Sequence, residues 1–128
     1  MQTGIKMTSL ECGEVYTSIC LASKEGVYSA YVRGKRCKTE DDFFKEISAA
    51  FQFPFYFGEN WPAMDECLCD LEWLNITKIF VVIDDFSSMF AGQESLQSIL
   101  RNRVIKYFGI MVEYWKEQGV PVKVWLNN

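Results

Sequence analysis

The sequence predicts a small α/β domain in which a three-stranded parallel sheet packs against helices. One reason is the order of hydrophobic patterns, which runs strand, helix, helix, strand, helix, strand. A second reason is that each connection between strands is long enough for a helical crossover, as parallel strands require. A third is the continuous apolar run at residues 78–83, which is typical of a central strand buried on both faces. With 128 residues and no internal repeat or linker, one domain over residues 1–128 is expected.

The first strand of this sheet is predicted at residues 27–32, a run of β-branched and aromatic side chains. Residues 15–21 have the same character, and residues 23–26 are typical of a turn between two strands. The sheet can therefore gain an N-terminal strand or a hairpin, and the sequence leaves both alternatives open.

The first helix is predicted to begin after Thr39, whose hydroxyl can cap it. Residues 40–42 are all acidic and fill the first turn, where the helix dipole favours negative charge. Pro54 limits the helix at its other end. Five apolar side chains fall on one helical stripe and are assigned to the core: Phe43, Phe44, Ile47, Ala50 and Phe51.

The second helix is predicted to follow a sharp aromatic turn. Gly58 permits the turn, Asn60 is a good N-cap, and Pro62 falls in the first helical turn, where a missing N–H costs little. Positions 64, 68 and 71 are apolar and share one face of the helix. The helix therefore has a buried face and an acidic face, and the latter carries Pro62, Asp65, Glu66, Cys69 and Asp70.

The third helix is predicted over Gln93–Gln118, where apolar residues recur at steps of three and four. Gly109 marks a break or a kink in it, and Gly119 is a plausible residue to end it. Residues 121–126 alternate between apolar and polar, which predicts a last strand at the sheet edge or exposed on one face.

Negative charge is concentrated in one quarter of the chain. The whole sequence has 13 basic and 17 acidic residues, for a net charge of −4. Residues 40–72 contain nine acids and one base, a net charge of −8, and the remainder is positive. Two interpretations follow: either two helices with solvated acidic faces, or an acidic face that docks a basic partner.

The composition also excludes several classes of function. There is no His, which removes a Ser-His-Asp triad, a Cys-His pair and a His-ligated zinc site. A pI of about 4.8 is a poor match to a nucleic-acid binder. Five cysteines without a signal peptide indicate reduced thiols in the cytoplasm, and no apolar run is long enough to span a membrane. We expect no metal and no cofactor.

Residues 54–71 contain a specific pattern: Pro54, the run Tyr56-Phe57-Gly58-Glu59-Asn60-Trp61, Ala63 and Cys67-Leu68. This pattern resembles that of the barstar family, small cytoplasmic inhibitors of secreted bacterial ribonucleases. The resemblance extends through the order of elements over residues 27–126 and leaves residues 1–26 as an N-terminal extension. The resemblance implies a barstar-like fold whose second helix, with the turn before it, inserts into a ribonuclease active site. Helix carboxylates there take the place of substrate phosphates.

Carried over residue by residue, the resemblance implies a partner-binding surface, and this sequence departs from the family pattern at several of its positions. Pro62 occupies a helix position where family inhibitors carry a key Asp, and Glu66 keeps the charge at the other such position. Asp65 stands where the family has a Trp, and the family's assisting Glu of the later helix corresponds to Tyr114. The implied surface comprises Tyr56, Gly58, Asn60, Trp61, Pro62, Asp65, Glu66, Cys69 and Asp70, with Glu113 from the later helix.

The leading hypothesis is a cytoplasmic inhibitor of the immunity or antitoxin type. It would mask the cationic active site of a bacterial ribonuclease or related toxin. The alternative is a protein–protein interaction module on the same fold with a non-nuclease target, for which Trp61 and Pro62 serve as an apolar anchor. An enzyme built on Asp84 and Asp85 at a strand end is a third hypothesis, but without His no nucleophile–base pair is evident. We therefore expect a binding protein and no catalytic residues.

Overall fold

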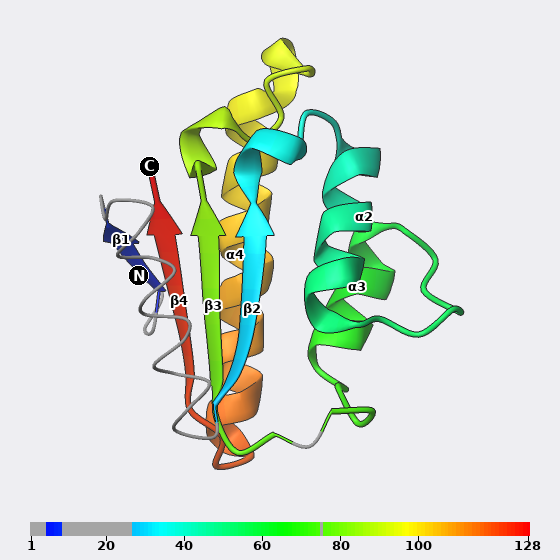
Figure 1. The fold of residues 1–128 in the computed structure, drawn as a ribbon, viewed down its shortest axis with the longest axis vertical. Coiled ribbons are helices and arrows are strands. Elements are labelled where there is room, and N and C mark those ends of the chain that lie inside the picture. Colours follow the sequence, from blue (N-terminus) through cyan, green and yellow to red (C-terminus); the bar gives the residue numbers. More distant parts are fainter. Residues whose placement is uncertain (1–4, 9–26, 75) are drawn as a thin grey trace.

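A four-stranded, wholly parallel sheet forms the centre of the computed structural model, which describes residues 5–8, 27–74 and 76–128 (Figure 1). The strand order is β1 (Ile5–Thr8), β4 (Val122–Asn127), β3 (Ile79–Asp84) and β2 (Tyr28–Arg33). The predicted three-stranded parallel sheet is therefore confirmed, and a further N-terminal strand pairs in parallel with β4. The strand and turn predicted at residues 15–21 and 23–26 lie outside the described residues.

The central strand is β3, as its continuous apolar sequence predicts. All six of its residues are buried, and it pairs with β2 on one side and β4 on the other. The expectation that the last strand lies at the sheet edge is wrong, because β1 covers its outer side. The alternative expectation holds in part: Val122, Val124 and Leu126 are buried, whereas on the other face Lys123 is exposed, Trp125 is half-buried and Asn127 is buried.

Three helices pack on one face of the sheet (Figure 1): α2 (Glu40–Phe51) and α3 (Trp61–Leu68) connect β2 to β3, and α4 (Gln97–Glu117) connects β3 to β4. Thr39 caps α2, since its hydroxyl accepts a hydrogen bond from the backbone N–H of Asp42 at 3.3 Å. The second helix was expected to include Leu71, but α3 ends at Leu68; α4 begins at Gln97, four residues after the predicted start at Gln93. Gly109 lies inside α4 without breaking it.

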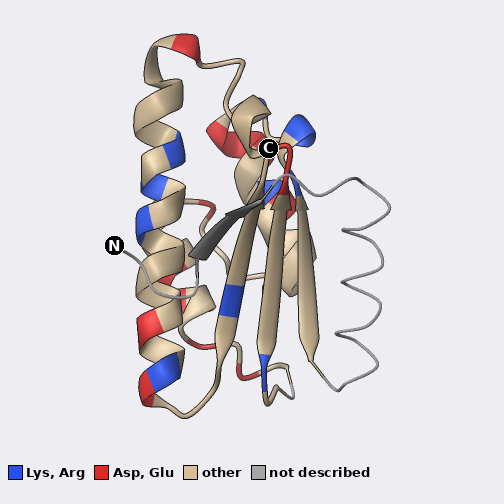
Figure 2. Ribbon diagram, turned by 90° about the vertical axis from the view of Figure 1, so that its left-hand side faces the viewer, with Lys and Arg blue, Asp and Glu red and all other residues tan. Residues whose placement is uncertain are grey.

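The main hydrophobic core lies between these helices and the sheet. Its largest fully buried side chains include four Phe rings: Phe43, Phe51, Phe90 and Phe108. The strands themselves carry few charges (Figure 2). The opposite face of the sheet has a smaller buried pair, Phe80 and Val82, against which Trp125 packs. Within the described residues, no helix is both long and apolar enough to cross a membrane.

Candidate functional site

The turn between α2 and α3 is held by Asn60, whose side chain makes two hydrogen bonds. The amide oxygen accepts from the backbone N–H of Ala63 at 2.8 Å, which caps α3, and the amide nitrogen donates to the carbonyl of Gly58 at 3.1 Å. An added Cβ at Gly58 would lie 3.1 Å from that same nitrogen, so a larger residue would require the Asn60 side chain to shift. The Gly-Glu-Asn motif therefore fixes the position of the turn relative to the helix.

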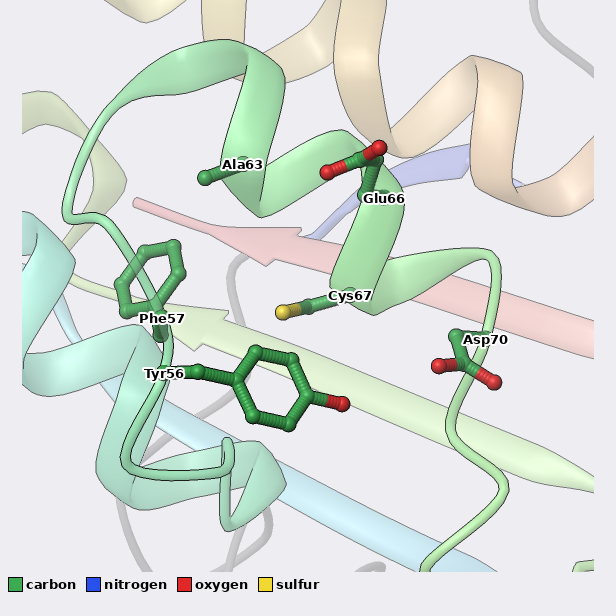
Figure 3. A pocket seen from close by; sticks show the side chains of 6 residues that line it. All are labelled: Tyr56, Phe57, Ala63, Glu66, Cys67 and Asp70. Atoms are coloured by element: carbon green, nitrogen blue, oxygen red, sulfur yellow. The ribbon is translucent and has the colours of Figure 1, made fainter.

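Tyr56 and α3 border a surface hollow of about 340 Å³ (Figure 3). In Figure 3 the ring of Tyr56 lies across from Cys67, Glu66 projects from α3 beside Cys67, and Asp70 lies on the turn that follows the helix. The loss of hydration and then the charge of Asp70 raise the pKa of the Tyr56 hydroxyl, so this group stays protonated and can donate a hydrogen bond. The hollow is lined by Tyr56, Phe57, Ala63, Glu66, Cys67 and Asp70.

Three carboxylates lie on α3 and the turn after it. Glu66 and Asp70 are exposed, and Asp65 is half-buried with an oxygen 3.9 Å from Sγ of Cys69. In the part of the chain that the structure describes, none of these three carboxylates forms an ion pair with a Lys or Arg. Their negative charge is therefore not neutralised by the protein itself and remains available to a cationic partner.

The structure corrects the expectation that Trp61 offers an exposed apolar anchor. Its side chain is 8% exposed, and its ring stacks between Phe43 and Tyr107 at centroid distances of 5.3 and 5.7 Å. Its Nε1–H donates to a carboxylate oxygen of Glu40 at 2.8 Å, and Arg103 lies over the ring. Trp61 therefore joins α2, α3 and α4 to one another. Pro62, in contrast, is exposed at the start of α3.

An exposed aromatic residue that the sequence reasoning missed is Phe55. It is fully exposed, and its ring lies 5.9 Å from that of Tyr56, which is 60% exposed. Phe53 and Phe57 on either side point to the core, where their rings pack edge to face at 4.8 Å. The alternation of these three Phe around the turn was the available signal.

The remaining predicted positions lie around the same region or on another element. Cys69 is half-buried, and burial followed by the charge of Asp65 raises the pKa of its thiol to about 11, so it is protonated and a poor nucleophile. Glu113 is exposed on α4. That helix contacts α3 through Trp115, whose Nε1–H donates to the carbonyl of Leu68 at 2.7 Å. The structure thus groups Tyr56, Glu66 and Asp70 at one hollow.

Asp84, one of the two acids behind the enzyme hypothesis, has a structural role. The carboxylate of Asp84 is buried and accepts from the Tyr31 hydroxyl at 2.6 Å, the Asn127 amide at 2.7 Å and the backbone N–H of Asp85 at 3.0 Å. These bonds join the ends of β2, β3 and β4. Among residues 5–8, 27–74 and 76–128, no three His, Cys, Asp or Glu side chains are grouped to hold a metal ion.

The fold and the site together define a class of protein: a compact parallel α/β domain that presents a carboxylate-bearing helix beside an aromatic turn. The chain belongs to the barstar family, because the family model described as Barstar (barnase inhibitor) matches residues 27–127. No curated protein matched the chain. The match confirms the resemblance carried by the motif, and the family is one of inhibitors rather than enzymes.

Proposed function

We propose that this protein is a cytoplasmic inhibitor of the immunity type, which binds and masks the cationic active site of a bacterial ribonuclease or related toxin. The observation that carries the proposal is the set of three carboxylates, Asp65, Glu66 and Asp70, without an ion-pair partner among the described residues. Glu66 and Asp70 line the hollow beside Tyr56, and Asp65 and Glu66 belong to a helix whose other face is buried. Membership in a family of barnase inhibitors supports the same class of partner.

The chemistry of the partner explains why carboxylates suit it. A ribonuclease must hold the phosphates of RNA, and it does so with basic groups in a concave site. A carboxylate that enters this site takes the place of a phosphate oxygen and compensates those cations for the water that they lose on binding. A pair of opposite charges about 4 Å apart gains roughly 4 kcal/mol at the effective dielectric of a protein surface, before desolvation is subtracted.

The rigidity of α3 favours this use of its charges. Met64 and Leu68 are fully buried beneath the helix, Asn60 caps its start, and Trp115 binds the carbonyl of Leu68 at its end. The carboxylates are therefore presented on an ordered backbone, so a partner does not have to pay the entropy of ordering it. Binding also relieves the mutual repulsion of the three acids.

The departures from the family pattern bear on which target is bound. Pro62 supplies no charge at the start of α3, and Glu66 reaches farther than an Asp at the same position. Asp65 adds charge on another side of the helix, and Asp70 adds charge in the turn that follows it. This arrangement supports a target whose basic groups are spaced differently from those of barnase, so the proposal names the class of toxin and not barnase itself.

A second candidate is an interaction module with a non-nuclease target, and fully exposed Phe55 favours it. A nuclease active site built to hold phosphates gives no obvious place for this ring, which lies beside the ring of Tyr56. An apolar recess next to a basic patch on some other protein would accommodate both.

A binding titration against a panel of bacterial ribonucleases tests the proposal. We expect one of them to bind below micromolar concentration, with an association rate that falls as salt increases. Glu66→Gln is expected to weaken this complex at least about tenfold, since it removes one charge from a desolvated contact. Glu94→Gln, the same change at an exposed site before α4, serves as the matched control and is expected to leave affinity unchanged.

Two results would contradict the proposal. One is that no ribonuclease binds more tightly than micromolar. The other is that Glu66→Gln and Glu94→Gln have equal effects. Affinity capture with the purified chain then separates the two candidates, because a captured basic protein without nuclease activity that depends on Glu66 supports the interaction module.

A further inference from the structure

One side of α4 is exposed along almost its whole length. Side chains spaced three and four residues apart share this side, because such steps return to the same line on a helix. Ile99, Ile110 and Tyr114 on it are 56%, 40% and 38% exposed, so half of the exposed large hydrophobic side chains of the described chain lie here. We call this line the α4 row, and it consists of Ile99, Arg103, Lys106, Ile110, Tyr114 and Glu117.

The charges of the α4 row are ordered along the helix. Arg103 and Lys106 lie before Ile110, whereas Glu117 lies after it. Figure 2 shows basic residues along the middle of α4, and acidic residues together with Lys116 toward its C-terminal end. Lys116 precedes Glu117 in the sequence but lies on another side of α4, where it borders a different hollow together with residues 119–123.

The spacing around Ile110 is symmetric. Arg103 comes seven residues before Ile110 and Glu117 seven after, so each is two turns away in opposite directions. Lys106 and Tyr114 come four residues before and four after. If α4 is reversed about Ile110, every basic residue of the row therefore falls opposite a group that attracts it.

We propose that the α4 row is the contact surface for a second copy of this chain, with the two α4 helices antiparallel about a twofold axis at Ile110. Ile110 packs on its own counterpart, and Arg103 pairs with Glu117 of the other copy. Lys106 lies over the ring of Tyr114 of the other copy, a cation–π contact. The contact is self-complementary, as a twofold interface requires, whereas a parallel arrangement would bring like charges together.

The α4 row contains none of the residues that line the hollow of Tyr56 and α3. It shares with the implied target surface only Tyr114, which stands at the position of the family's assisting Glu, and the dimer is inferred from the charges of α4 and not from the carboxylates of α3. A copy of the same chain is the occupant that the charges favour. A uniformly acidic or basic partner would meet repulsion at one end of the row.

Sedimentation equilibrium of the full chain, from micromolar to millimolar concentration, tests the dimer. We expect a reversible dimer. Ile110→Glu is expected to raise its dissociation constant at least about tenfold, because it sets two carboxylates against each other at the axis. Glu117→Arg, which faces Arg103 of the other copy with a like charge, is expected to weaken the dimer as well. Adding Arg103→Glu to Glu117→Arg restores the attraction and is expected to recover the dimer.

The control for the change of charge is Glu94→Arg, an exposed position before α4 that lies outside the α4 row. Far-ultraviolet circular dichroism of each variant confirms that it is folded, which matters most for Arg103 because it contacts the ring of Trp61. A chain that stays monomeric throughout, or a dimer that Ile110→Glu leaves unchanged, overturns the proposal. So does a double variant weaker than Glu117→Arg alone.

Discussion

Replacing Trp61 by Ala separates a structural role from a binding role. If Trp61 were an exposed anchor, the variant would keep its stability and lose affinity; the structure predicts a large loss of stability. The side chain is 8% exposed and stacks on Phe43 and Tyr107, with a third ring, Phe44, edge-on at 5.1 Å. Removing a buried Trp of this kind costs about 3–5 kcal/mol through lost burial and the cavity that remains.

The loss of the Nε1–H bond to Glu40 adds less to this cost in stability than the loss of a fully buried hydrogen bond to a charged group would. Glu40 is only half-buried and also accepts from Gln93 at 3.2 Å, so water and Gln93 replace much of the lost contact. For a domain of this size the cost corresponds to a fall in melting temperature of about 12–20 °C, at about 4 °C per kcal/mol.

The assay is urea unfolding followed by far-ultraviolet circular dichroism, with Phe55→Ala as the matched control. Both variants remove an aromatic ring, but Phe55 is fully exposed and its loss is expected to change stability by less than about 0.5 kcal/mol. The reasoning is refuted if Trp61→Ala unfolds at the same urea concentration as the parent protein, or if the two variants lose equal stability.

Three further changes test the local structure. Burial alone would raise the pKa of Glu46, but the hydrogen bonds and charge of Arg33 outweigh burial and lower that pKa. The ionised Glu46 therefore stabilises the fold fully above the ordinary pKa of 4.5, and this contribution is lost as the pH falls below that value. Glu46→Gln is expected to flatten the acid limb of a stability–pH curve. Gly34→Ala would place a Cβ 2.3 Å from the carbonyl oxygen of Asp85, and thermal unfolding is expected to show a loss of several degrees. Asn60→Ala removes the cap of α3 and is expected to cost about 1–2 kcal/mol in urea unfolding, whereas Asn60→Ser, which keeps a capping oxygen, recovers part of it.

The parts of the fold that local rules decide were predictable from the sequence. Thr39 and Asn60 are capping residues followed by helical patterns, and both cap as expected. The continuous apolar run of β3 likewise predicted burial on both faces. The position of β4 was not predictable in the same way, because its alternating pattern is that of an edge strand. Its outer neighbour, β1, is only four residues long and far away in sequence.

The same distinction applies to the candidate site. The helical period alone places Glu66 on the outer side of α3 and Leu68 in the core, as the structure has them. Trp61 was assigned wrongly because its surroundings come from Phe43 and Tyr107, residues on two other helices that only the tertiary structure brings together. Phe55 was overlooked for the converse reason, since an aromatic side chain within an aromatic run is most often part of a core.

The way in which α3 is held has a consequence for how its specificity can change. The contacts that fix the helix come from its start, its buried side and its last carbonyl: Asn60, Trp61, Met64, Leu68 and the bond from Trp115. An exposed outer side chain such as Glu66 contributes little to folding. Selection can therefore exchange or move the acids on this surface without loss of stability, so one scaffold can follow a target whose basic groups are rearranged.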